Sequence, residues 1–226
     1  MKQMRSKDAA ADMPSRSRGR PRAVSEETRR DQIIKSAFNV FLELGYAGTT
    51  TDIVAARCGI SKRTLYEVFS SKTALFQAVI VAHRRAMLDL PRDRDGRPLA
   101  DALASIFWID IDPRLERRRQ AFIHLVMTEI RQFPEIGEML RRDGVEESRR
   151  LLADWLALER DRGVIASDDV QRDAGMLMDM IFGGLAVHSG GPPKRLDRNQ
   201  RRNHIRRCID VFLNGVSRRS CDRQGD

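Results

Sequence analysis

The sequence contains few of the residues that support covalent chemistry or membrane insertion. Its three cysteines, Cys58, Cys208 and Cys221, show no spacing typical of a disulfide framework, which favours reduced thiols. No apolar run approaches the ~20 residues that a membrane-spanning helix needs, and the N-terminus lacks the apolar core of a signal peptide. Phosphate-binding glycine loops, nucleophile elbows and H-E-x-x-H motifs are absent as well. These absences argue against an enzyme, a secreted protein and a membrane protein, and predict a cytoplasmic protein without a cofactor.

Metal and redox sites have weak support in the sequence. His204 and Cys208 lie four residues apart on a predicted helix, a spacing that can bind a metal, but no third ligand is visible. Cys208 and Cys221 could form a redox pair, although Cys221 falls in a polar tail. The sequence therefore predicts no metal site, and His83, His124 and His188 are interpreted as structural.

Positive charge is the most informative feature of the composition. The 226 residues include 41 Lys and Arg against 32 Asp and Glu, so the formal net charge is +9. Such a charge favours a polyanionic partner, either nucleic acid or an anionic membrane, over a basic protein with no such partner. Hydrophobic residues make up 41% of the chain, which is enough for a buried core.

Apolar side chains recur every three or four residues, and this periodicity predicts an all-α fold. A first helix is expected from Ser25, whose side chain can cap it, to Gly45, which can end it. Beyond a loop at residues 91–98, helices are expected at about 98–110, 114–132, 134–142, 144–161, 168–189 and 197–216. The predicted organisation is a basic arm over 1–24, an N-terminal three-helix domain over 25–90, a larger helical domain over 98–217 and a tail over 218–226.

The segment between Thr50 and Phe69 has the pattern of a helix-turn-helix. Thr50 can cap a short helix, Gly59 permits a tight turn, and Ser61 can cap a second short helix. The second helix of such a motif places its first residues in the major groove of DNA. Base-reading and phosphate-binding roles are therefore predicted for one set of side chains: Thr50, Thr51, Ser61, Lys62, Arg63, Thr64, Tyr66 and Lys72. The arginine-rich arm before residue 23 either enters a minor groove or contributes only bulk charge.

Residues 29–80 resemble the DNA-binding domain of the tetracycline-repressor (TetR) family of bacterial regulators. The resemblance is carried by Ala37, Phe41, Gly45, Tyr46, Thr49-Thr50, Val54-Ala55, Gly59-Ile60-Ser61, Thr64-Leu65-Tyr66, Phe69, Ser71-Lys72 and Leu75-Phe76. The chain departs from the family at Glu67-Val68, where many members carry an aromatic residue or histidine. Glu67 would be repelled by DNA unless it points elsewhere.

The stretch from Phe122 to Gly144 is similar to one ligand-binding subgroup of the same family. The resemblance implies a helical effector domain whose last two long helices pair across a homodimer. Large, soft side chains are the candidates for lining a small-molecule pocket, with ordinary core packing as the alternative. These candidates are Trp108, Phe122, Met127, Trp155, Met176 and Met180.

The sequence thus predicts a homodimeric regulator, most simply a repressor, that a small-molecule effector releases from a double-stranded DNA operator. A ligand-independent architectural protein shares the positive charge but would show no operator preference. An activator on the same fold is a further alternative. An enzyme would need a paired acid and base or a nucleophile set, and none is evident.

Overall fold

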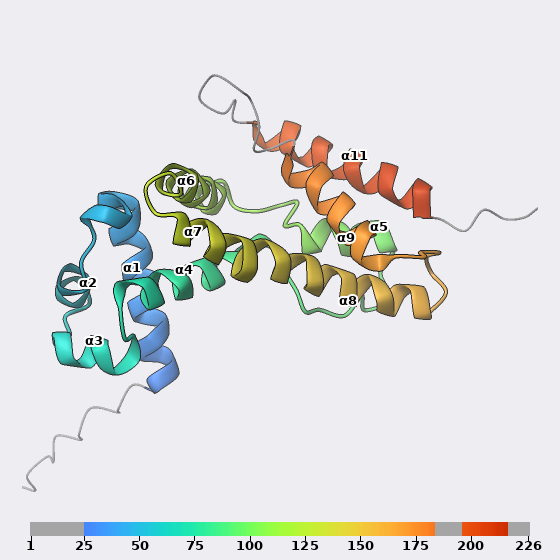
Figure 1. The fold of residues 1–226 in the computed structure, drawn as a ribbon. Coiled ribbons are helices and arrows are strands. Elements are labelled where there is room, and N and C mark those ends of the chain that lie inside the picture. Colours follow the sequence, from blue (N-terminus) through green and yellow to red (C-terminus); the bar gives the residue numbers. More distant parts are fainter. Residues whose placement is uncertain (1–24, 184–195, 217–226) are drawn as a thin grey trace, which may run out of the picture.

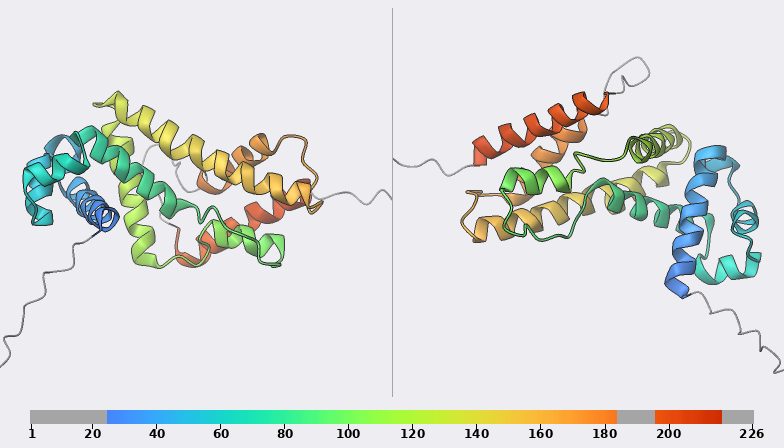
Figure 2. Two further views of the ribbon diagram at one scale, coloured as in Figure 1. Left: turned by 90° about the horizontal axis from the view of Figure 1, so that it is seen from below. Right: turned by 180° about the vertical axis from the view of Figure 1, so that it is seen from behind.

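The computed structural model describes residues 25–183 and 196–216, and the regular elements in these ranges are all helical (Figure 1). The molecule is elongated: α1, α2 and α3 form one end, and the long rod containing α8 runs toward the other (Figures 1 and 2). This confirms the all-α fold class. The predicted arm over 1–24, the end of the helix predicted at 168–189, and the tail from 218 lie outside the described residues.

Hydroxyl side chains cap the first turns of the helices in the N-terminal half. Ser25 Oγ accepts a hydrogen bond from Thr28 N at 3.1 Å, and Ser71 Oγ accepts one from Ala74 N at 3.0 Å. Both caps satisfy N–H groups that the helix itself leaves unpaired. The elements are α1 (Glu26–Gly48), α2 (Thr51–Cys58), α3 (Lys62–Val68) and α4 (Lys72–Met87).

Gly45 ends the regular part of α1, as the sequence predicts. Its φ of 72° and ψ of 176° lie in a region that side chains other than glycine adopt only with strain. A Cβ at this position would also lie 2.7 Å from Glu129 Oε1, on α6. Glycine is therefore required by the turn, whereas the nearby Glu129 carboxylate is the end of a flexible side chain that can shift.

The C-terminal half differs from the sequence-based expectation at its longest element. Two helices were expected at 134–142 and 144–161, but residues 134–161 form one continuous rod with a π-helical stretch in the middle. Gly144 is buried in this rod, and a Cβ there would lie 3.7 Å from Ile80 on α4. The prediction of separate helices at 134–142 and 144–161 is wrong, because the backbone stays helical through the π-helical stretch that packs against α4. The elements are α5 (Leu99–Ile106), α6 (Pro113–Glu129), α7 (Pro134–Met139), η1 (Leu140–Glu146), α8 (Glu147–Asp161), α9 (Val170–Met178), η2 (Asp179–Gly183) and α11 (Arg198–Val216).

One buried cluster joins the N-terminal helices to α6 and α7. Tyr46 lies at its centre, with its ring centroid 4.9 Å from that of Phe76 and 5.0 Å from that of Phe133. Phe122 of α6 is 1% exposed and packs against Phe38 of α1 at 5.2 Å. The three N-terminal helices therefore share their core with the C-terminal half through α6 and α7.

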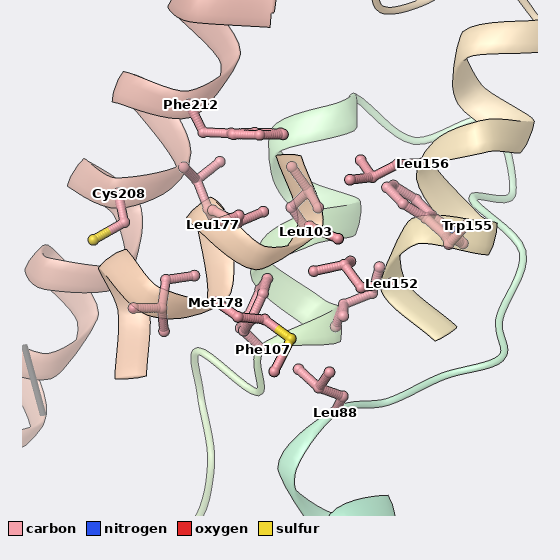
Figure 3. Packing of buried hydrophobic residues seen from close by; sticks show 14 of the residues in the cluster. Leu88, Leu103, Phe107, Leu152, Trp155, Leu156, Leu177, Met178, Cys208 and Phe212 are labelled. Carbon is pink, nitrogen blue, oxygen red and sulfur yellow. The ribbon is translucent and has the colours of Figure 1, made fainter. Parts of the chain in front are cut away.

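A second buried cluster holds the far half together (Figure 3). Leu103 of α5 and Phe107, the residue after α5, point into it from one side and Leu177 of α9 from another. Trp155 of α8 and Phe212 of α11 complete the cluster, and they are only 4% and 5% exposed. The last helix thus belongs to the monomer core along one face.

His83 and Arg119 are buried together between α4 and α6. The His83 ring lies 4.6 Å from that of Phe122, and its Nε2 has no hydrogen-bond partner among the described residues. Burial, with a smaller contribution from the Arg119 charge, lowers the pKa of His83 to about 3. His83 is therefore neutral in the folded protein at ordinary pH, which agrees with its interpretation as a structural residue.

This histidine predicts a loss of stability in mild acid. In the unfolded chain His83 has a pKa near 6.5. Below about pH 6.5 the unfolded state therefore binds a proton that the folded state does not bind until the pH approaches 3. The group should lower the free energy of unfolding by about 1.4 kcal/mol for each further pH unit, down toward pH 3. His83→Leu should flatten the pH dependence by that amount, as measured by urea denaturation at pH 7.5, 6 and 5.

The exposed His124 provides the matched control, because His124→Gln changes the same residue type on the surface. Carboxylates titrate equally in all three proteins, so only the difference in slope counts. If His83→Leu and the parent protein lose stability in parallel between pH 7.5 and pH 5, the burial account of His83 is wrong.

Candidate nucleic-acid interface

The packing of α2 against α3 decides which side of α3 is free. Val54 and Ala55 of α2 and Leu65 of α3 are at most 3% exposed. Gly59 caps α2 with a φ of 64°, a left-handed conformation that glycine adopts without strain. The turn therefore joins two short helices through an apolar contact, and the opposite side of α3 faces outward. This is the helix-turn-helix arrangement that the sequence predicts.

The predicted base-reading side chains lie on that free side. Lys62, Arg63 and Tyr66 are exposed, whereas Thr64 is half-buried. The Arg63 side chain is 90% exposed. Figure 1 shows α3 at the extremity of the molecule, so that a duplex can approach it without meeting the C-terminal half. The structure therefore brings these side chains together on one outward surface.

Each of these three exposed side chains has a partner within the motif. The Lys62 ammonium lies 2.8 Å from an oxygen of Asp52, and its hydrogen bond to Asp52 raises the pKa of Lys62. Arg63 Nε donates to Glu67 at 3.2 Å, and the Tyr66 hydroxyl lies 3.2 Å from that of Thr51. The reading groups are thus held by neighbours before any DNA is present.

The hydroxyl groups at the helix starts have local roles. Thr50 Oγ1 accepts from Ile53 N at 3.2 Å and Ser61 Oγ accepts from Thr64 N at 3.0 Å, so both cap their helices as predicted. Thr51 is 9% exposed, and its hydroxyl lies 3.2 Å from that of Tyr66. A phosphate contact at the start of α2 stays a prediction.

Lys72 is placed differently from the other predicted DNA contacts. Its ammonium donates to the Tyr46 carbonyl at 2.9 Å and lies 4.3 Å from the centre of the Tyr46 ring. Lys72 therefore braces the start of α4 against the end of α1. A contact between Lys72 and a DNA phosphate stays a prediction.

Two further residues support this surface and were not identified from the sequence. Arg30 of α1 stacks over the Phe69 ring at 4.4 Å and donates to the Val68 carbonyl at 3.4 Å, which anchors the end of α3. Glu129 of α6 accepts from Tyr46 N at 2.9 Å, which links the C-terminal half to the motif. Both contacts join residues far apart in the chain, so no local sequence pattern could indicate them.

The predicted ligand-lining residues do not surround one cavity. Trp155 lines a shallow groove of about 330 Å³ between α8 and the loop after α4. Phe122 is buried in the N-terminal cluster, and Met127 and Met176 are 58% and 54% exposed. The other two candidates are Trp108, which is exposed, and Met180, which is half-buried. The structure therefore distributes the six candidates over the C-terminal half, and a ligand-lining role for any of them stays a prediction.

Within residues 25–183 and 196–216, no three His, Cys, Asp or Glu side chains converge as a metal site would require. His204 Nε2 hydrogen-bonds to the Ile181 carbonyl at 3.1 Å, and its ring lies near the free thiol of Cys208. Cys221 lies outside the described residues. No helix in the described ranges is both long and apolar enough to cross a membrane.

A compact helix-turn-helix with an outward basic face, joined to a larger helical domain, defines a DNA-binding protein of the transcription-regulator class. Residues 33–79 match the family model for bacterial regulatory proteins of the tetR family. Residues 102–215 match the C-terminal domain model of AefR-like transcriptional repressors. The chain belongs to the TetR family.

Individual relatives agree with this assignment. The HTH-type transcriptional regulator YvkB of Bacillus subtilis is 22% identical over 82% of this chain and 96% of its own length. The HTH-type transcriptional activator FasR of Mycolicibacterium smegmatis is 37% identical over 70 residues, which cover 31% of this chain and 32% of FasR. Among solved structures, the flavonoid-responsive regulator FrrA is 28% identical with a TM-score of 0.58, covering 85% of this chain and all of FrrA.

Proposed function

We propose that this chain is a homodimeric, sequence-specific transcriptional repressor that binds an operator in duplex DNA and leaves it when a small molecule binds the C-terminal half. One observation carries the DNA-binding part: Lys62, Arg63 and Tyr66 stand exposed together on α3, at the end of the molecule. Arginine and lysine can donate to guanine O6 and N7 in the major groove. The site of action that follows is the cytoplasm of a bacterial cell.

Dimerisation follows from the size of the reading surface. The seven-residue α3 reaches too few base pairs to select an operator alone, and a two-fold dimer doubles the number. The apolar side chains Met176 of α9 and Val211 of α11 are 54% and 45% exposed in the single chain. These two helices are therefore the surface that we assign to the partner subunit, which would set the α3 helices about 34–36 Å apart.

Repression and release by a ligand have two lines of support. The C-terminal half matches a model described for repressors, and a relative of similar fold is described as flavonoid-responsive. Glu129 on α6 holds Tyr46 at the end of α1, so a ligand that displaces α6 acts directly on the motif. To move the protein from nearly full to nearly absent DNA binding, the ligand must prefer the released state by about 5.5 kcal/mol.

Selection of bound duplexes from a random DNA pool tests the proposal. The expected result is a near-palindromic sequence whose half-sites are about one helical turn apart. A transcription assay with that sequence upstream of a reporter then distinguishes repression from activation. Activation is the alternative because the relative FasR is described as an activator. If no sequence is enriched, the proposal of an operator-specific regulator is wrong and the architectural-protein alternative is favoured.

A further inference from the structure

Two carboxylates lie on the same surface as the basic side chains of α3. Asp52, in the first turn of α2, pairs with Lys62, and the two side chains are 61% and 58% exposed. Glu67, one helical turn after Arg63, pairs with it and is 57% exposed. A surface built only for affinity to phosphate would not carry two negative charges at this position, because they repel the DNA backbone.

The geometry of the Arg63 pair leaves its base-reading groups free. Glu67 engages Nε at 3.2 Å, and within the described part of the chain neither terminal nitrogen of Arg63 has a hydrogen-bond partner. Those two nitrogens form the fork that can donate to O6 and N7 of one guanine. Arg63 can therefore read a guanine while its pair with Glu67 persists.

Binding to DNA of the wrong sequence has a different consequence. Without a matching base edge, Arg63 and Lys62 gain most by turning to phosphates, and that movement separates them from Glu67 and Asp52. The carboxylates then face the phosphates without a counterion. Their charge therefore weakens non-specific binding and has little effect on operator binding.

We propose that Asp52 and Glu67 are specificity-determining residues, which hold the two basic side chains for base reading and penalise their use on phosphates. This inference rests on the proposed function, since it concerns how the same surface distinguishes an operator from other DNA. Neither role follows from the helix-turn-helix pattern, and Glu67 stands at a position where the chain departs from many members of the family.

The test compares the full-length protein with Glu67→Gln and Asp52→Asn, each of which removes one charge but keeps a side-chain oxygen that can accept a hydrogen bond. Affinity is measured by fluorescence anisotropy for the selected operator and for a random-sequence duplex over a range of salt. For each variant, random-duplex binding should gain about one unit of salt dependence, which corresponds to about an eightfold tighter complex near 0.1 M salt. Operator affinity should change by less than about threefold, so the specificity ratio falls.

Asp154→Asn is the matched control, because Asp154 pairs with Arg150 at i,i+4 on α8, far from the motif. The proposal is overturned if Glu67→Gln leaves random-duplex binding unchanged, if it strengthens operator and random binding equally, or if Asp154→Asn has the same effect. A protein that binds random duplex but enriches no operator overturns the proposed function. An enriched operator with an unchanged ratio in both variants overturns this inference alone.

Discussion

Replacing Lys62 and Arg63 together by alanine is expected to remove most of the operator affinity. Each side chain that pairs with a guanine contributes about 1–3 kcal/mol of discrimination, so the double variant should bind the operator roughly 30- to 10⁴-fold more weakly. Both residues are exposed and their ion pairs lie on the surface, so folding should change by less than about 1 kcal/mol. Gel-shift titration measures the first quantity and thermal unfolding the second.

Arg57→Ala serves as the control for loss of positive charge. Arg57 belongs to the same motif but lies on α2, where it pairs with Glu43 of α1 at 2.7 Å. It should lower operator affinity only slightly. Operator binding within threefold of the parent in the double variant, or an equal loss in Arg57→Ala, would contradict the assignment of α3 as the reading helix.

Arg201→Met is expected to produce the largest loss of stability in the C-terminal half. Arg201 is 5% exposed, and its guanidinium donates to the carbonyls of Phe107, Trp108 and Ile109 at 2.9–3.2 Å. It also lies 3.4 Å from Glu116. The variant would remove the guanidinium donor from the three carbonyls at the end of α5 and leave Glu116 with Arg119 and Gln120 as its remaining partners, at a cost of about 3–5 kcal/mol.

The neighbouring Arg202 is the control for the effect of burial. It pairs with Asp110, in the segment after α5, at 3.2 Å, but its side chain is 32% exposed. Arg202→Met should cost about 1 kcal/mol or less. Urea denaturation followed by tryptophan fluorescence measures both, since the two tryptophans, Trp108 and Trp155, lie in this half. Similar losses in the two variants would contradict the role assigned to Arg201.

The local features of the fold could be predicted because neighbouring residues determine them. Ser25, Thr50 and Ser61 each cap a helix through a bond to a backbone N–H three residues ahead. Gly45 and Gly59 end helices in conformations that favour glycine. The outward side of α3 also followed from the chain, since burial of Leu65 leaves Arg63 and Tyr66 free.

Features that depend on distant contacts could not be predicted. The sequence predicts two helices that meet near residue 143, yet the rod continues there through a π-helical stretch that packs against α4. Phe122 looks like a pocket residue, yet it fills the core that α6 shares with α1 and α4. Lys72 donates to the Tyr46 carbonyl, a contact that no local pattern indicates, while its contact with a DNA phosphate stays a prediction. In each case the deciding neighbour is far away in sequence.

The contacts of Tyr46 give the structure a route between its two halves. Glu129 of α6 holds its N–H, Lys72 of α4 holds its carbonyl, and its ring packs against Phe133 after α6. A displacement of α6 therefore reaches α1 and α4 at one residue. This arrangement explains how the proposed ligand could change the position of α3 without touching it.

The proposed dimer places two copies of α3 in successive major grooves on one face of a duplex. Hydroxyl-radical footprinting on the selected operator tests it most directly. The predicted result is two protected stretches, about 34–36 Å apart, that disappear together with the Lys62 and Arg63 double variant. A single protected stretch, uniform protection along the duplex, or a footprint that survives in the double variant would contradict it.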